Sequence, residues 1–598
     1  MKRKQILKCA LIMALPILGG NMITSCIDDF ESINTSNVQV DPNDLPTSAQ
    51  WLEPMTYCYP PQQNMFQFWT NLTIDLYSGY FMTPNGGFTN GDLGENRGHS
   101  GGMHENYYLH IFNNTRRIIA ACEAEGEKGL AAVMSIVQAY GTLMTTDAYG
   151  PLAYTSILEA DKKMAEDPNS TPTTSFYFDS QQQLYKIMLT DLGDAITAIE
   201  SMTETEKSKL KSADVWCEGD TEMWVKIANT MRLRMALRLS KRVDEMNQVG
   251  IDVKQIATDA AKNTLANGGK DILIEKGLEN YMWLMFNWGD CGFNANLVTL
   301  MSGMKDPRQP LYMTKNIDEV LGDGYSKKTD EDKVVTYWKG DTKVDKSEAV
   351  VVEANKEYLG IRFASGLPNK PNNWASFSSW VDYKNEIGIF TAPLPIFKQA
   401  ESYFLLAEAK LRWNIGNESV QQLYEDGIRK SMENELKYRG NYAGIKAYPD
   451  GAVEDYIKGT STQEDFKDPI WPKLDIEALN KLCVKWDEGA SQEDKLARII
   501  TQKYFALFPL STEAWAEQRR TGYPILFPAF VNESNNAIDS TEGIRRVIYA
   551  ENEYNTNGEE LEKSGIKLLN DENTSKKGFT GDKGGTHVWW DNANKGNF

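Results

Sequence analysis

Residues 222–242 read EMWVKIANTMRLRMALRLSKR, and this stretch decides the fold because its apolar side chains recur with the period of an α-helix. The apolar positions are Trp224, Ile227, Ala228, Met231, Met235 and Leu239. Their i, i+3, i+4, i+7 spacing places them on one face of a helix. Arg238, Lys241 and Arg242 fall in the last turns, where cations suit the negative end of the helix dipole. The stretch is therefore predicted to be an amphipathic helix.

The same period recurs through much of the chain. Similar apolar stripes run through residues 111–122, 130–144, 184–199, 400–411 and 496–507. Asp179 is the predicted N-cap of the helix over 184–199, and Ser511 that of a helix through Arg519. We expect helix pairs near 105–150, 179–242, 396–436 and 491–520. Helix pairs with alanines at their contacts are typical of tetratricopeptide-type hairpins, with an all-α bundle as the alternative.

Three long inserts separate the predicted helices. Residues 83–102 are rich in glycine and asparagine, residues 322–352 are charged with a strand-like run at 334–338, and residues 442–475 are mixed. Because binding residues are concentrated on loops that a rigid scaffold holds in place, we expect function on the inserts rather than on the helices.

The N-terminus predicts the compartment. Three cations at positions 2–4 precede an apolar stretch from Ile6 to Gly19, which is shorter than the ~20 residues of a membrane span and is typical of a signal peptide. Residues 23–26, ITSC, are similar to the lipobox of bacterial lipoproteins, so Cys26 is the predicted lipidation site; an ordinary secretory signal is the alternative. The predicted divisions are a signal peptide over 1–25, a lipid-anchored linker over 26–50 and one binding domain over 51–598.

Composition argues against nucleic-acid partners. The 598 residues carry a formal net charge of −20, and we find no basic patch strong enough to hold a phosphate backbone. Beyond Cys9 and Cys26 the five cysteines are widely spaced and include no CxxC pair, so they suggest no disulfide framework.

Seven segments, in order along the chain, resemble the SusD/RagB family of surface nutrient-binding lipoproteins. They are DFESINT at 29–35, TDAYGPLAY at 146–154, EMWVKIANTMRLR at 222–234, MKDPR at 304–308, AESYFLLAEA at 400–409, EAWAEQRRTGYP at 513–524 and RRVIYAENEYNTN at 545–557. The second departs from the family pattern, since Pro151 and Leu152 are transposed and the usual aspartate after Gly150 is missing. Together the segments span nearly the whole chain.

The resemblance implies a fold, a location and a partner. The fold would be a right-handed superhelix of tetratricopeptide-like helix pairs that supports a large, irregular, insert-rich half with minor β structure. The acidic residues Asp28, Asp29 and Glu31 after the lipid cysteine resemble an export signal to the outer leaflet, which implies a lipid-anchored protein on the cell surface. The implied partner is a SusC-like TonB-dependent outer-membrane transporter, over which such proteins sit as a lid.

Aromatic residues in the inserts are the candidates for ligand binding. Sugars pack their C–H faces on aromatic rings while their hydroxyls bond polar groups at the rim. Two segments combine both residue types, and resemblance to the family also favours them. The candidates are Tyr281, Trp283, Trp288, Asp290, Phe293 and Asn296 in one, and Phe81, Phe88, Asp92 and Arg97 in the other. Trp374 and Trp380 rank second. Burial of these rings in the core is the alternative, and the ligand stays open between a glycan and a peptide.

Catalytic motifs are lacking. The 83 acidic residues make chance carboxylate pairs inevitable, so abundance does not indicate a glycoside hydrolase. His99, His104 and His110 match no zinc-binding spacing, and neither a phosphate loop nor a Gly-x-Ser-x-Gly motif occurs. We therefore expect a binding protein without catalytic residues, metal or cofactor; calcium binding stays open, and a surface hydrolase and a purely structural repeat protein are the alternatives.

Overall fold

The computed structural model describes residues 47–59, 63–84, 88–274, 284, 288–366, 372–381 and 393–598. Cys26 lies outside these residues, and its lipidation stays a prediction. The predicted fold class, mainly α with minor β structure, is confirmed: helices reach 24 residues, whereas strands have at most five. In the described part of the chain, no helix combines the length and apolar character needed to cross a membrane.

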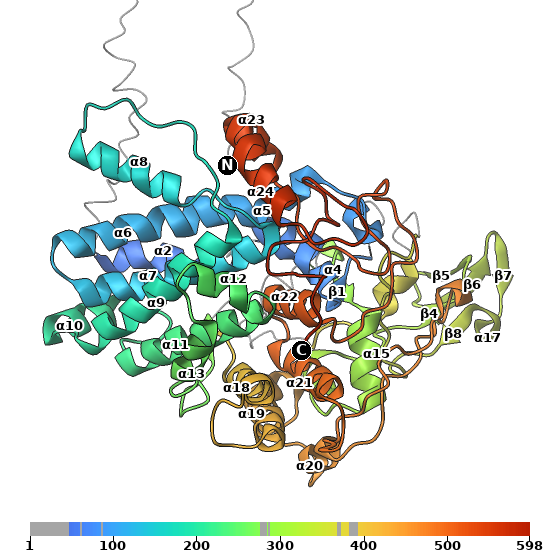
Figure 1. Ribbon diagram of the computed structural model, residues 1–598. Helices are drawn as coiled ribbons and strands as arrows, with labels where there is room; N and C mark the ends of the chain where they lie inside the picture. The colour runs from blue at the N-terminus through green and yellow to red at the C-terminus, as the bar shows by residue number, and fades with distance from the viewer. Residues whose placement is uncertain are drawn as a thin grey trace, which may run out of the picture. The chain divides into compact units, whose positions relative to one another are not determined.

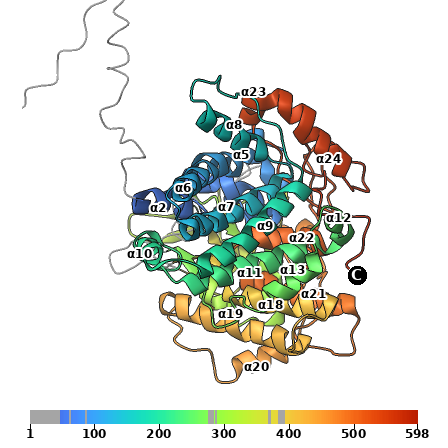
Figure 2. The ribbon, with the colours of Figure 1, turned by 60° about the vertical axis from the view of Figure 1, so that its left-hand side comes forward.

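The helices of the N-terminal half pack as successive neighbours. Their bounds are α2 Thr47–Thr56, α3 Gln63–Phe66, η2 Gln67–Ile74, α4 Asp75–Tyr77, η3 Thr89–Asp92, α5 Arg97–Asn106, η4 Tyr107–Phe112, α6 Asn113–Ala124, α7 Lys128–Tyr149, α8 Thr155–Glu166, α9 Gln181–Glu200, α10 Glu204–Ala213, α11 Thr221–Arg238, η5 Leu239–Lys241, α12 Val243–Gln248 and α13 Val253–Ala260. Helix α6 packs on α7, α7 on α9, α9 on α11 and α11 on α13, as Figure 2 shows.

The helices of the C-terminal half join this array through α18, which contacts α11, α19 and α21. Their bounds are α15 Ala295–Met304, α16 Gln309–Tyr312, α17 Lys346–Ala349, η7 Asn372–Ser376, α18 Gln399–Trp413, α19 Val420–Ala443, α20 Ala452–Ile457, η8 Pro472–Leu474, α21 Gln492–Leu507, α22 Ser511–Thr521, α23 Glu551–Glu560, η9 Leu561–Ile566 and α24 Lys567–Glu572. The glycine at 427 lets the Phe404 ring of α18 approach α19, because a Cβ there would lie 2.8 Å from it.

Short strands tie the inserts to the helices. They are β1 Phe81–Met82, β2 Ile272–Ile274, β3 Gly292–Phe293, β4 Val320–Leu321, β5 Tyr325–Thr329, β6 Val335–Lys339, β7 Thr342–Val344, β8 Val350–Val352 and β9 Leu394–Phe397. β1 pairs with β3, β2 with β9 and β4 with β8, all antiparallel, while β5, β6 and β7 form a three-stranded sheet. Figure 1 shows this sheet at the edge of the insert-rich half, where the strand-like run at 334–338 was expected.

A buried ion network joins α7, α11, α18, α21 and α22. The Arg238 side chain is 1% exposed and donates to Asp147 at 2.8 Å and to Glu513 at 2.6 Å. Further members of the network are Arg234, Glu401, Glu408, Lys503, Glu517 and Arg520. Arg238 was expected to interact with the end of its own helix, but carboxylates from two other helices bind it instead. A buried charge is tolerated only with such partners.

Both predicted helix caps are wrong. The helix over 184–199 is α9, and its N-cap is Ser180, whose side chain accepts from the Gln183 amide. Asp179 instead accepts from the amides of Tyr154 and Thr155, at the start of α8, at 3.3 and 2.7 Å. This carboxylate thus satisfies two amides of a helix that lies earlier in the chain.

Helix α22 has Leu510 at its N-cap, without a side-chain hydrogen bond, and Ser511 is its first residue. Ser511 is buried one position past the N-cap, inside the first turn of the helix. Helix α5 also departs from expectation, because it begins at Arg97 inside the predicted insert over 83–102. Its N-cap is Asn96, whose side chain accepts from the amides of Gly98 and His99.

Candidate ligand-binding site

The two candidate segments meet in space through the β1–β3 pair. Phe81 faces Phe293, and Met82 faces Gly292, although the segments lie more than two hundred positions apart. A second link is the hydrogen bond from Gln67 Nε2 on η2 to Asp290 Oδ2, at 3.1 Å. A loop that follows η2 and a loop that precedes α15 are therefore held as neighbours.

The rings of Phe81 and Phe293 lie in the core. They are 0% and 1% exposed and their centroids are 5.7 Å apart. Trp380 and Phe508 complete the cluster, with centroids 5.7 and 5.5 Å from that of Phe81. Phe81 and Phe293 therefore hold the two segments together by apolar burial, and any ligand contacts fall to other side chains.

Asn296 and Asp290 are buried polar residues. Asn296 Oδ1 accepts from the Phe527 amide at 2.7 Å, and its Nδ2 donates to Asn294 Oδ1 at 3.0 Å. Its amide group therefore fixes the start of α15 against the loop at 527. Asp290 holds the segment after Trp288 against η2 through Gln67.

Trp288 differs from the buried rings because 40% of it is exposed. It stands two residues before Asp290, which η2 holds through Gln67. An exposed tryptophan on a tethered segment offers an apolar face that a ligand can cover.

A second set of rings lies beside the same helix η2. His99 stacks on Phe68 with centroids 5.2 Å apart and meets Phe88 edge-on at 5.7 Å. All three side chains are half-buried, and we name this group the His99 cluster. Burial lowers the pKa of His99, so at neutral pH its imidazole is an uncharged donor and acceptor. Phe68 follows Gln67 in the chain and Trp288 stands two residues before Asp290, so the cluster and Trp288 each lie close in sequence to one end of the Gln67–Asp290 hydrogen bond.

Arg97 and Asp92 hold loops in place. Arg97 is paired with Asp582, donates to the Tyr549 carbonyl at 3.0 Å and lies over the Tyr554 ring at 4.6 Å. Asp92 accepts from the Gly366 amide at 3.1 Å, and burial raises the pKa of its carboxyl.

Tyr281 and Trp283 lie outside the described residues. Of the second-rank tryptophans, Trp374 is 5% exposed and Trp380 is 1% exposed, so both pack in the interior. Phe68 was not among the candidates predicted from the sequence, and His99 was considered only as a possible zinc ligand. The one signal for them was the asparagine at 96, which caps the helix that presents His99.

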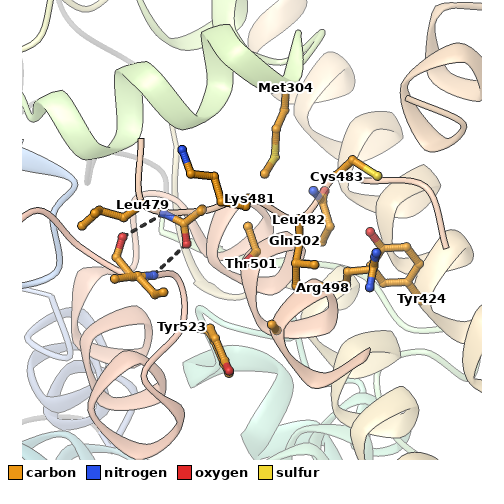
Figure 3. Close-up of a pocket in the computed structure, with 13 residues that line it drawn as sticks. Met304, Tyr424, Leu479, Lys481, Leu482, Cys483, Arg498, Thr501, Gln502 and Tyr523 are labelled. Atoms are coloured by element: carbon orange, nitrogen blue, oxygen red, sulfur yellow. Dashed lines mark hydrogen bonds between the residues drawn. The ribbon is translucent and has the colours of Figure 1, made fainter. Parts of the chain in front are cut away.

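A separate cavity, drawn in Figure 3, lies between α15, α19, α21 and the loop at 479–483. Met304, Tyr424, Cys483, Arg498 and Tyr523 are among its lining residues. Its volume is about 60 Å³, far below the roughly 300 Å³ at which small-molecule sites begin. Among the described residues, no cluster of three or more His, Cys, Asp or Glu side chains is arranged to hold a metal ion.

The sequence matches a family model, SusD-like: SusD and RagB outer membrane lipoprotein, over residues 28–591. The chain belongs to this family. No curated protein matches it. Among solved structures, a chitin-binding SusD homologue from Flavobacterium johnsoniae is 25% identical, with a TM-score of 0.71 over 92% of this chain and 100% of that chain.

Two further SusD homologues have the same fold. One from Bacteroides ovatus ATCC 8483 is 26% identical, with a TM-score of 0.70 over 91% of this chain and 99% of that chain. One from Bacteroides thetaiotaomicron VPI-5482 is 24% identical, with a TM-score of 0.71 over 92% of this chain and 100% of that chain. The suspected SusD/RagB relationship is thereby confirmed, and the family is one of outer-membrane lipoproteins.

Proposed function

We propose that this SusD-like protein is lipid-anchored at Cys26 on the cell surface, binds an oligo- or polysaccharide, and delivers it to a SusC-like TonB-dependent outer-membrane transporter. The observation that carries the glycan assignment is the exposed ring of Trp288 at the junction of the two candidate segments. The relative from Flavobacterium johnsoniae is itself chitin-binding, which supports a glycan over the alternative, a peptide.

Binding would combine ring stacking with hydrogen bonds. Trp288 would cover one face of a sugar ring, and the neutral His99 imidazole would exchange hydrogen bonds with its hydroxyls. Stacking and hydrogen bonding to a sugar need no pair of catalytic carboxylates, and in this proposal the protein binds the polysaccharide without cleaving it. The transporter is the partner that the family resemblance implies; in the described part of the chain, no helix is long and apolar enough to cross a membrane.

Native affinity electrophoresis of residues 27–598, the mature chain without its lipid-bearing Cys26, in gels with a panel of polysaccharides tests the proposal. We expect one polysaccharide to retard the protein, and Trp288→Ala and His99→Ala each to weaken binding about tenfold, in line with a ring contact of about 1 kcal/mol or more. Tyr177→Ala is the matched control, since this ring is 39% exposed but bonded to Glu159 on α8.

Equal retardation of wild type and Trp288→Ala would contradict the placement of the site. If no polysaccharide retards the protein, a peptide ligand becomes the better assignment. Release of new reducing ends from the bound polysaccharide would contradict the non-enzymatic part of the proposal. If the full-length protein is purified from outer membranes and no TonB-dependent transporter accompanies it, the proposed partner is contradicted.

A further inference from the structure

A second, larger hollow lies where the ends of α11 and α18 meet the last residues of the chain. Its volume is about 550 Å³, within the range of small-molecule sites. The hollow, which we name the basic cup, is lined by Ser240, Lys241, Val243, Asp244, Lys254, Arg412, Trp413, Gln492, Lys595, Gly596, Asn597 and Phe598. In Figure 2 the end of the chain lies near α12 and α21, and Asn597 donates to Glu493 on α21 at 2.7 Å.

Four cations line the basic cup against two anionic groups, the Asp244 side chain and the backbone carboxylate of the last residue, Phe598, in a protein whose net charge is −20. Lys595 lies 3.8 Å from Asp244 and 3.6 Å from Glu245, so its charge is partly balanced. Among the described residues, neither Lys241 nor Lys254 has a carboxylate within salt-bridge distance. The cup therefore holds more positive charge than its own acidic residues neutralise.

Arg412 supplies a buried donor without an acceptor. Its side chain is 4% exposed; Nε donates to Glu408 at 2.6 Å and Nη1 donates to the Asn597 carbonyl. Its Nη2 is buried and has no hydrogen-bond partner among the described residues. A buried donor without an acceptor is destabilising, and an oxyanion from a ligand would satisfy it.

The charges that act on Lys241 are one carboxylate and three guanidinium groups. Burial lowers the pKa of its ammonium to about 8, opposed by Asp591 and reinforced by Arg520, Arg545 and Arg412. The Glu408 carboxylate that accepts from Arg412 is shared with Arg520, which donates to both of its oxygens at 2.6 and 2.7 Å. A bound anion would therefore stabilise the charged form of Lys241.

The wall of the basic cup is aromatic. Trp413 is half-buried, and Phe598 is 52% exposed with the Arg412 guanidinium 4.8 Å from its ring centroid. Cations beside rings suit a ligand that carries an anion on a ring-shaped body.

We propose that the basic cup is a second ligand site, which takes a carboxylate-bearing sugar. The carboxylate lies between Arg412 Nη2 and Lys241 Nζ, and the sugar ring packs against Trp413. This assignment rests on the proposed function in taking the body of the ligand to be a sugar. It extends that function, because it gives the protein a preference for acidic saccharides at a site distinct from Trp288.

Isothermal titration of the mature chain with glucuronate, glucose and inorganic sulfate tests the assignment. We expect glucuronate to bind at least tenfold more tightly than glucose or sulfate. Lys241→Gln and Trp413→Ala should each lower the glucuronate affinity at least fivefold. Lys211→Gln is the matched control, because Lys211 also lies in the last turn of a helix, α10, and should leave the affinity unchanged.

Equal binding of glucose would show that the carboxylate is not recognised, and equal binding of sulfate would show that only a bare ion is held; either result overturns the assignment. So does unchanged glucuronate affinity in Lys241→Gln. Failure of the proposed function is separate, because it is measured with polysaccharides and Trp288→Ala. Lys241→Gln should leave the retardation by a neutral polysaccharide unchanged.

Discussion

Replacing His587 by glutamine is expected to remove a pH-dependent part of the protein's stability. The His587 side chain is 4% exposed, its Nδ1 lies 3.2 Å from Asp591 Oδ2, and its Nε2 lies 3.7 Å from Glu542 Oε2. Burial alone would lower the pKa of His587, but the two carboxylates outweigh it and raise the pKa to about 9. The imidazolium thus clamps the loop at 542 to the segment at 591.

The magnitude follows from the difference between a pKa of about 9 in the folded protein and 6.5 in the unfolded chain, which corresponds to about 3 kcal/mol. Since the folded pKa is the higher one, the stabilisation is fully present below pH 6.5 and is lost as the pH rises through 9. Unfolding entropy of about 2.1 cal/mol/K per residue over roughly 550 residues converts 3 kcal/mol into about 3 °C in Tm.

Differential scanning calorimetry of wild type and His587→Gln at pH 6 and pH 10 measures this effect. We expect the difference in Tm between wild type and His587→Gln to be about 3 °C smaller at pH 10 than at pH 6. The other titrating groups are shared by both proteins, so their effects on Tm cancel in this difference. His99→Gln is the control: burial lowers the pKa of His99, so the stability of wild type relative to this variant should not fall as the pH rises from 6 to 10. A His587→Gln gap that is equal at both pH values would refute the reasoning.

Three further outcomes are expected. Arg520→Met should lower the free energy of unfolding by about 3–5 kcal/mol, because it leaves Glu408 and Glu517 buried without the cation they share. Calorimetry should show a loss of under 1 kcal/mol for the control Arg429→Met, whose ion pairs lie at the surface. Gly102→Ala should lower the Tm, because a Cβ at this position would lie 2.7 Å from the Phe68 carbonyl carbon. Gly558→Ala, where a Cβ would meet open space, should leave the Tm unchanged. Equal Tm values for the two variants would contradict the close contact at Gly102. In the native mature chain only Cys483 should react rapidly with a thiol reagent such as DTNB. The other four thiols are buried and their pKa values are raised: Cys58, Cys122, Cys217 and Cys291. A second rapidly reacting thiol would show that the interior opens.

The fold class could be predicted from the sequence because helix periodicity is local. The stripe spans a few turns: α11 carries it from Trp224 to Met235, and Leu239 follows at the start of η5. Cap residues were harder to predict, because a carboxylate next to one helix can serve another. Asp179 bonds the amides at the start of α8, which only the folded chain brings near.

The candidate site was harder to predict because exposure is set by long-range pairing. Phe81 and Phe293 sit in polar, insert-like segments, just as Trp288 does, and nothing in those segments separates them. The β1–β3 pair turns both phenylalanines into an interior cluster and leaves Trp288 outside it. Arg238 shows the same limit, since its partners Asp147 and Glu513 are distant in sequence.

The ligand site depends on the far end of the chain as much as on its own segments. Asp582 is buried and binds Arg97 at the start of α5, Arg546, the Tyr549 amide and the Tyr554 hydroxyl. The flanking arginines outweigh burial and lower the pKa of this carboxyl, so it stays ionised throughout the neutral range. Because α5 also presents His99, a single carboxylate near the C-terminus fixes the helix that carries part of the proposed glycan contact. A loop-built site of this kind can hold its rings in place without a ligand, since the order is supplied by buried ion pairs.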